Sequence, residues 1–412
     1  MKNIYVDVER CIKVQLKRIH DERNNLLESP VLISAILLIL FKPPYFNEIE
    51  VVDNIYNFIC VMILLFFLII AIYLKLTSKI IWLISYYGII FVSTLYNSGN
   101  IMSFLKENIY SFALCLVFAV YGDIALATFL NAFNAVHLYI YINLLTVLAF
   151  PGGLYKSEIY TQNWFLGYKN PMIRLLLPII CISFVNSIIK YERITVYNYF
   201  ILIITIISAF LVKSANGVVT VMIWTFFLIL SIFVPRIYRI INEKTVLIFY
   251  LLFIAVLFFV KIPNFVFSLL NIVGKKNSFM GRYRLWKIII KRIKERPLGG
   301  YGFLQGDEFV KFSNLRWASH AHNWILNILI LGGVILLVAF LYGFFCMSRS
   351  LSKYREKSAC IIVSITVMCF LVMGIDEAMT NSVFIYPIFI LGMDLGKLFD
   401  SKCENAKILV SW

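Results

Sequence analysis

Charged side chains are scarce in this 412-residue sequence, and their scarcity excludes an ordinary water-soluble domain. Lys, Arg, Asp and Glu make up 15% of the chain, whereas soluble domains carry about 25%. Hydrophobic residues make up 61%, and charge this sparse cannot cover a water-facing surface of this size. We therefore expect an all-α fold, a polytopic transmembrane helical bundle.

The cysteine spacing of zinc sites and disulfide frameworks is also lacking. The eight Cys residues form no CxxC pair and no His-linked spacing. Most lie inside apolar runs, which predicts small buried side chains. A cleavable signal peptide is not visible either, because the charged stretch Met1–Glu28 precedes the first apolar run. From these absences we predict no metal site and no cofactor.

Long apolar runs are what the sequence has in their place. A spanning helix needs about 20 mostly apolar residues. Candidate spans lie near 30–46, 54–76, 79–96, 108–122, 127–150, 171–189, 195–214, 216–234, 245–260, 323–346, 358–375 and 383–399. They divide the chain into a cytoplasmic tail (1–29), a bundle of about nine spans (30–260), a long loop (261–322), three C-terminal spans (323–399) and a second cytoplasmic tail (400–412).

The basic residues between the spans predict the orientation. If all twelve candidates cross and the N-terminus is cytoplasmic, the cytoplasmic side holds 20 Lys and Arg against 6 in the short outer connections. The first span is the weakest, because Pro43 and Pro44 follow it. Without it the counts become 14 and 12, which favour neither side. We therefore keep twelve spans, and we attribute the net charge of +16 to topology rather than to nucleic acid binding.

The long loop 261–322 contains a predicted amphipathic helix over Gly281–Arg296. Apolar residues recur there at helical spacing, with basic residues between them. We expect this helix to lie along the membrane surface, and we expect the apolar stretch Ile262–Val273 to lie on or dip into the interface. The segment Pro297–Gly302 then ends the helix.

Basic residues crowd this loop, with 12 Lys and Arg against 3 Asp and Glu. One interpretation is a helix that binds the anionic headgroups of membrane lipid. The other is a site for an anionic ligand such as a lipid-linked phosphate or pyrophosphate, which the planar Arg side chain suits. His320 and His322 follow on the same side, and a neutral imidazole is a plausible general base. Asn323 is a candidate cap of the next helix.

The order of these parts resembles the O-antigen ligase and polymerase superfamily of bacterial envelope proteins. The elements that carry the resemblance are Gly167-Tyr-Lys-Asn170, Gly281-Arg282 with Trp286, Arg296-Pro-Leu-Gly-Gly-Tyr-Gly302, His322-Asn323, and Leu329 with Gly332-Gly333. The long outer loop between late spans is also similar. Two departures stand out: Arg296 replaces a more usual Asn before Pro, and Lys213-Ser-Ala-Asn-Gly217 stands where members often carry Ser-Arg or Ser-Thr.

The resemblance implies transfer of a glycan from a polyprenyl pyrophosphate-linked oligosaccharide to an acceptor hydroxyl. The active site would lie on the outer face of the bacterial cytoplasmic membrane, and a chain-length regulator or a flippase would be possible partners. His322 would be the base, with Arg282 and Arg284 as the pyrophosphate clamp. The expected substrate-binding residues are Lys213, Arg296, His320, Asn323, Glu377 and Trp286.

Several functions remain open at this stage. A polymerase of lipid-linked repeat units is the leading interpretation, and a ligase that moves the finished chain to another acceptor uses the same chemistry. A glycosyltransferase that uses a lipid monophosphate donor is a third enzyme. A flippase for lipid-linked sugar is the non-enzyme alternative, but such transporters show internal repeats and interior charges. Here the spans are nearly free of charge, with Asp123 and Arg174 the main exceptions.

Overall fold

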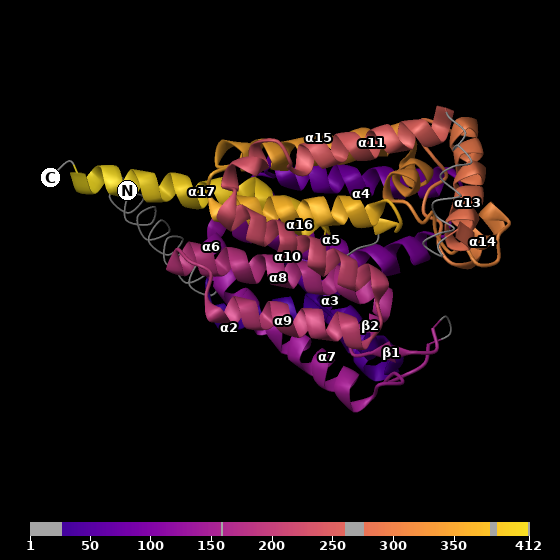
Figure 1. Ribbon diagram of the computed structural model, residues 1–412. Coiled ribbons are helices and arrows are strands. Elements are labelled where there is room, and N and C mark those ends of the chain that lie inside the picture. Colours follow the sequence, from indigo (N-terminus) through magenta and orange to yellow (C-terminus); the bar gives the residue numbers. More distant parts are fainter. Residues whose placement is uncertain (1–26, 158–159, 260–275, 380–384, 411–412) are drawn as a thin grey trace, which may run out of the picture.

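The protein, described by a computed structural model over residues 27–157, 160–259, 276–379 and 385–410, is a bundle of helices (Figure 1). The α-helices are α2 (Pro30–Leu40), α3 (Glu50–Tyr73), α4 (Ser78–Tyr96), α5 (Ile101–Ile124), α6 (Leu126–Ala132), α7 (His137–Ala149), α8 (Lys169–Tyr191), α9 (Val196–Leu211), α10 (Ala215–Phe233), α11 (Glu243–Phe259), α13 (Lys276–Glu295), α14 (Asp307–Ser313), α15 (Trp324–Lys353), α16 (Ser358–Gly374) and α17 (Ile385–Val410). Three 3-10 turns, η1 (Pro44–Glu48), η2 (Phe133–Val136) and η3 (Pro235–Arg239), and a small hairpin of β1 (Asn163–Trp164) and β2 (Gly167–Tyr168) complete the described elements.

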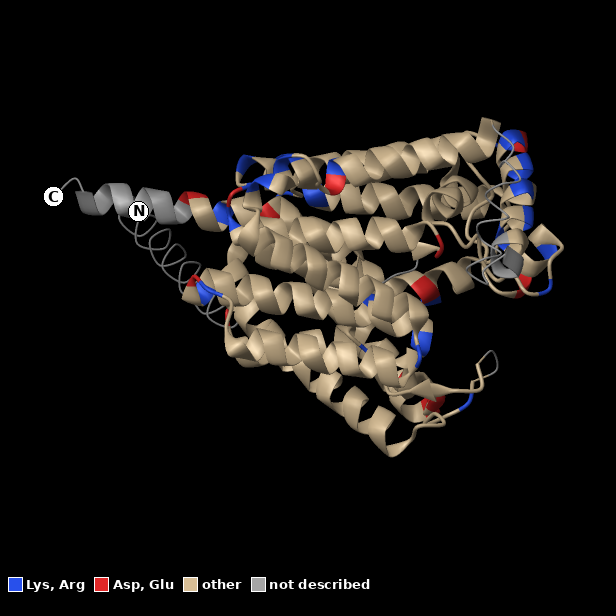
Figure 2. Ribbon diagram, in the orientation of Figure 1, with Lys and Arg blue, Asp and Glu red and all other residues tan. Residues whose placement is uncertain are grey.

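The helices run between two ends of the bundle, as Figure 1 shows. We call the end covered by α13 and α14 the capped end, and the end where α2 begins and α15 ends the basal end. Charged side chains gather at these two ends and leave a long belt with few charges between them (Figure 2). Seven described helical stretches are long and apolar enough to cross a membrane, and one of them, Leu126–Ala149, combines α6, η2 and α7. The all-α polytopic fold is thereby confirmed, while the count of about twelve spans stays a prediction.

Several boundaries differ from those expected. The run 30–46 forms a helix of only 11 residues, because Pro43 and Pro44 lack the backbone N–H that would continue it. The run 108–122 is part of the longer α5, which begins where Asn100 caps it by accepting a 3.0 Å hydrogen bond from the Ser103 N–H. The run 127–150 is divided into α6 and α7 by η2. The N-terminal tail up to residue 26 and the stretch Ile262–Val273 lie outside the described residues.

The predicted amphipathic helix is confirmed as α13. Figure 1 shows α13 lying across the capped end, roughly perpendicular to the bundle. Its apolar face is buried against the protein, with Leu285 and Ile289 fully inaccessible and Ile293 4% exposed. The apolar partners of this face are α11 and α15. That the helix lies along the membrane surface stays a prediction. Arg282 on this helix is half-buried, whereas the other described basic side chains of α13 are exposed, namely Arg284, Lys287, Lys291, Arg292 and Lys294.

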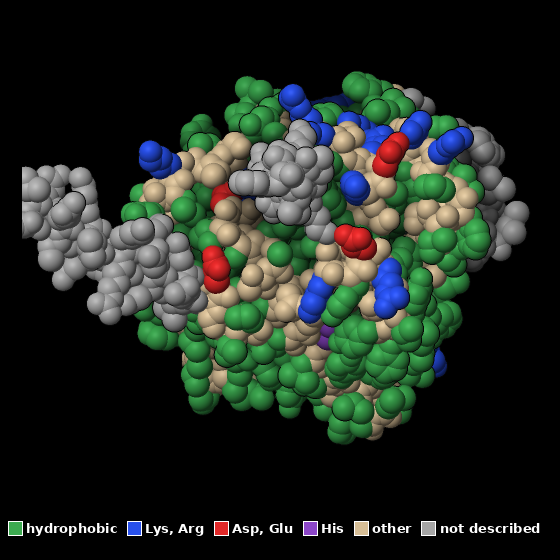
Figure 3. Space-filling view, turned by 90° about the vertical axis from the view of Figure 1, so that its left-hand side faces the viewer, with side chains coloured by type: hydrophobic (Ala, Val, Ile, Leu, Met, Phe, Trp, Pro, Cys, Tyr) green, Lys and Arg blue, Asp and Glu red, His purple; other side chains and the backbone are tan. Residues whose placement is uncertain are grey.

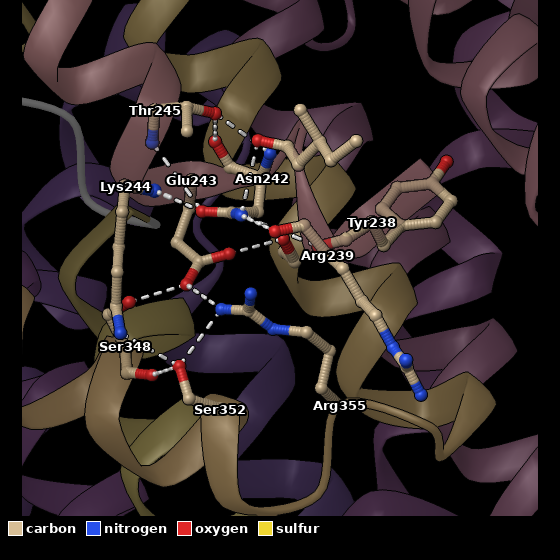
Figure 4. A network of polar contacts seen from close by, with 11 residues as sticks. Tyr238, Arg239, Asn242, Glu243, Lys244, Thr245, Ser348, Ser352 and Arg355 are labelled. Carbon is tan, nitrogen blue, oxygen red and sulfur yellow. Dashed lines mark hydrogen bonds and ion pairs between the residues drawn. The ribbon is translucent and has the colours of Figure 1, made fainter. Parts of the chain in front are cut away.

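The basal end is held by buried polar networks. Glu243, at the start of α11, accepts hydrogen bonds from Ser348 on α15 and from Ser364 on α16, the latter at 2.5 Å (Figure 4). The Arg355 guanidinium lies 3.8 Å from the same carboxylate. A buried carboxylate is tolerated only when it is bonded in this way, so the network ties three helices together. Figure 3, which views this end, shows basic side chains spread over it and an apolar flank.

A break in α15 brings together two glycine-containing elements of the sequence, Gly332-Gly333 and the segment 297–302. Gly332 and Gly333 have non-helical backbone angles, and Gly333 has a φ of +62°. The segment 297–302 packs against this break and supplies the hydrogen bonds that the helix loses there. The four bonds run from the Tyr301 N–H to Ile330 (2.7 Å), from Gly302 to Leu331 (3.1 Å), from Val334 to Pro297 (2.8 Å) and from Ile335 to Leu298 (3.2 Å). The break therefore fixes the C-terminal end of α13 to α15.

Adding one methyl group at Gly300 tests this interlock. Gly300 has a φ of +66°, and a Cβ there would overlap the carbonyl oxygen of Ile330. We expect Gly300→Ala to lower the free energy of unfolding by about 1–3 kcal/mol. The matched control is Gly299→Ala, whose Cβ would meet nothing within 4 Å. Thermal unfolding of both purified variants is the measurement, and equal midpoints would contradict the interlock.

Candidate active site

His320 and His322 lie together at the capped end, in the loop that leads into α15. Their ring centroids are 4.0 Å apart, and the His320 Nδ1 accepts a 3.1 Å hydrogen bond from the His322 backbone N–H. His322 has a φ of +47°, in the left-handed region that few non-glycine residues adopt. Such a conformation persists only where the surrounding structure enforces it.

Asn323 and Trp286 enforce this conformation. The fully buried Asn323 caps α15 by accepting the Leu326 N–H at 3.1 Å, and its amide donates to the Ile375 carbonyl at 3.1 Å. The Trp286 indole, 2% exposed, donates to the backbone carbonyls of Ala321 at 3.2 Å and His322 at 3.3 Å. Both residues were predicted to contact substrate. Both are buried and hydrogen-bond backbone groups of the histidine loop or next to it, while their contact with substrate stays a prediction.

Two acids follow α16 beside the histidines. A Glu377 carboxylate oxygen lies 4.0 Å from the His320 Nε2, and the Glu377 side chain is buried. Asp376 pairs with Arg282 at 2.5 Å. The structure thus brings Glu377, Arg282 and both histidines, all predicted from the sequence, into one cluster with Asp376.

Arg174 is the cation of this cluster that the site prediction missed. It lies in the second turn of α8, and its charge acts on both His320 and His322. Within the described residues it forms no ion pair, so its charge is available to an anionic ligand. The signal for it was present in the sequence, since Arg174 is one of the few charges in an apolar run and follows the Gly167–Asn170 element closely.

Three predicted basic residues lie elsewhere. Arg284 is exposed, two residues from Arg282 and therefore on another side of α13. Arg296 stands 14 residues from Arg282, roughly 21 Å along the helix axis, where it hydrogen-bonds Asn97 and lies 5.1 Å from the centroid of the Tyr301 ring. Lys213 is exposed between α9 and α10. Arg282 and Arg284 thus lie on different sides of α13, and their expected joint role as a pyrophosphate clamp stays untested.

Burial keeps both imidazoles neutral. It lowers the pKa of His320 well below its usual 6.5, and the charges of His322, Arg174 and Arg282 lower it further. Burial also lowers the pKa of His322, although the Glu377 carboxylate and the Asp376 backbone oppose the change. The His322 Nδ1 is buried and has no hydrogen-bond partner within the described residues. A neutral imidazole with an unpaired nitrogen can accept a proton.

These shifts predict the acid side of the pH profile. The base works only when it is neutral, so kcat/KM should fall as His322 becomes protonated, with a midpoint below pH 6.5. Glu377→Gln removes a group that raises the pKa of His322, so the midpoint should move to still lower pH. Initial rates between pH 4.5 and 8 measure both curves. A midpoint above 6.5 would exclude His322 as the titrating base.

The same cluster has the composition of a metal site. Ligand atoms of His320, His322 and Glu377 all lie within 4.8 Å of one another. Imidazole and carboxylate groups are the ligands of many zinc enzymes, which use three protein ligands and a water. The geometry therefore suits either a metal ion or a base beside an orienting acid.

The comparison with known families bears on the part of the chain that contains most of this cluster. Residues 200–341 match the family model described as O-Antigen ligase. No curated protein matches the chain. The matched region includes Arg282, His320 and His322, whereas Arg174 and Glu377 lie outside it. The predicted resemblance to the O-antigen ligase and polymerase superfamily is confirmed over this region of the chain.

Proposed function

We propose that the protein polymerises lipid-linked oligosaccharide repeat units into a surface polysaccharide, by transferring glycan from polyprenyl pyrophosphate to an acceptor sugar hydroxyl. The observation that carries the proposal is the neutral His322 beside Arg174 and Arg282 at the end of a membrane bundle. Two Arg side chains from separate helices suit the doubly charged pyrophosphate. The predicted cytoplasmic segments hold 20 Lys and Arg against 6 in the short outer connections, which supports an active site on the outer face of a bacterial cytoplasmic membrane.

The proposed reaction is a single displacement. The acceptor hydroxyl gives its proton to His322 as its oxygen bonds to the anomeric carbon of the donor. The bond from that carbon to the pyrophosphate oxygen breaks, and the electron pair leaves with polyprenyl pyrophosphate. Arg174 and Arg282 stabilise the developing negative charge, and Glu377 stabilises the imidazolium until its proton passes to water. Lys213 is a further candidate for contact with substrate.

A ligase that moves the finished chain to a different acceptor remains the second candidate, because the matched family is described by that activity. The test uses the purified full chain in lipid nanodiscs with lipid-linked oligosaccharide extracted from bacterial cells. A polymerase should convert this substrate alone into a ladder of lengths. A ligase should need a second lipid acceptor and should give one transfer per acceptor. If neither product forms, the proposed function is overturned.

Metal independence is part of the proposal and has its own prediction. We expect transfer to continue in the presence of EDTA at full rate, because His322 needs no ion to accept a proton. The measurement is the initial rate before and after chelation, with the metal content of the purified chain determined in parallel. Loss of activity that is restored by Zn²⁺ would instead assign His320, His322 and Glu377 as metal ligands.

A further inference from the structure

A large cavity at the capped end lies outside the histidine cluster. It has a volume of about 690 Å³ and lies between the first turns of α3 and α5, with η1 and the start of α8 completing its wall. Cavities of this size hold small organic ligands and short saccharides. Its polar lining comes from Lys42, Asn47, Asp53, Asn54, Asn57, Lys106, Glu107 and Tyr110.

The polar groups of this cavity are balanced in charge and already ordered. Lys42 is paired with Asp53, the Asn57 amide donates to Asp53 at 2.9 Å, and the Tyr110 hydroxyl donates to Asn57 at 3.0 Å. Lys106 and Glu107 add one charge of each sign. Such a lining gives little attraction to a pyrophosphate, unlike the Arg174 and Arg282 pair. Amide, hydroxyl and paired ionic groups instead match the alternating donors and acceptors of sugar hydroxyls.

An apolar groove of about 290 Å³ lies next to this cavity, between α3, α4 and α5. The two spaces share Leu105 and Ile109 in their walls. The lining of the groove is almost entirely apolar and includes Leu64, Ile84 and Phe91. A polar cavity with an apolar groove beside it suits an amphiphile, which has a hydrophilic head and a hydrocarbon tail.

Two features relate the cavity to α8 and to the capping helices. Leu175, which lines the cavity, follows Arg174 directly on α8. On the opposite wall, the Glu107 side chain is hydrogen-bonded to Gln305, which lies between α13 and α14. A saccharide in the cavity therefore lies beside the elements that carry Arg174 and the capping helices.

We infer that this cavity and groove form the acceptor site, which binds a lipid-linked saccharide with its sugars in the cavity and its hydrocarbon chain in the groove. The inference rests on the proposed function, since it assigns the second substrate of the same transfer. Donor and acceptor would then reach the histidines from different sides. The charged donor pyrophosphate takes the arginine site, and the acceptor sugar takes the neutral cavity.

The test uses an alkyl maltoside with a photoreactive diazirine in its chain, added to the purified full chain in nanodiscs. We expect labelling of the groove wall, which mass spectrometry maps. Gly88 lines the groove and has open space where a Cβ would stand, so Gly88→Leu should fill it without a backbone clash. Asn54→Trp should fill the cavity. Each should lower labelling by about tenfold, because a filled pocket removes the contacts of the ligand.

The control is Ile55→Trp, which adds the same side chain one residue along α3 at a position that is 51% exposed and outside the cavity lining. It should label like the unmodified chain. Equal labelling by an alkyl phosphocholine of the same chain length would overturn the inference, because the groove would then take any tail. Labelling that survives both filling variants would overturn it as well. His322→Asn should label normally, so loss of transfer with intact labelling separates the base from the acceptor site.

Discussion

Replacing His322 with asparagine should lower the rate of glycan transfer by about 10²–10⁴-fold, the usual contribution of a positioned general base. The imidazole is the group in the cluster that is neutral, partly buried and left with an unpaired nitrogen. Asparagine suits the test better than alanine, since His322 has a φ of +47° and Asn tolerates that left-handed conformation. The loss should therefore reflect the missing base rather than a collapsed loop.

The measurement compares the glycan transfer rate and the unfolding midpoint of the purified variant with those of the unmodified chain. In cells the variant should accumulate lipid-linked repeat units on the outer leaflet and make little long glycan. Accumulation on the inner leaflet would favour a flippase instead. Glycan of normal length from the variant would remove His322 from the role of base. His320→Asn is the companion variant, and its effect should be smaller because His320 contacts the His322 backbone.

Much of this site was predictable because its parts are local in sequence. Helical spacing of apolar residues predicted α13, and the nearness of two histidines to a helix start predicted their pairing. The same local rule argues against Arg284 as the partner of Arg282 in a pyrophosphate clamp, because residues two apart on a helix point to different sides. The sequence prediction did not apply that rule to the two arginines. Arg284 is exposed, while Arg282 reaches Asp376.

The features that the prediction missed depend on contacts between distant segments. The bonding of 297–302 to the break at Gly332 and Gly333 joins two glycine elements that the sequence presents separately. Hydropathy measures composition along the chain, whereas the cavity between α3 and α5 requires knowing which helices are neighbours.

Replacing Arg174 and Arg284 in turn gives the sharpest test of the arrangement seen in the structure. We expect Arg174→Ala to lower kcat/KM by about 10²–10³-fold, as removal of one preorganised donor to a developing charge does. Arg284→Ala removes the same charge from an exposed site and should change the rate by no more than about twofold, in line with the small worth of exposed charges. Arg174 lies on α8, outside the matched family region, so the two variants separate the structural assignment from the sequence-based one.

Arg174→Lys refines the comparison, because it keeps the charge but loses the planar pair of donors that fits a phosphate. It should fall between the native rate and that of the alanine variant. The pH profile gives a second readout, which does not depend on how tightly the donor binds. Arg174 lowers the pKa of both histidines, so its removal should raise the acid midpoint of the pH profile, while Arg284→Ala should leave it unchanged. If the alanine variants lose activity in the opposite order, the clamp belongs to α13 alone, and Arg174 only helps to keep the histidines neutral.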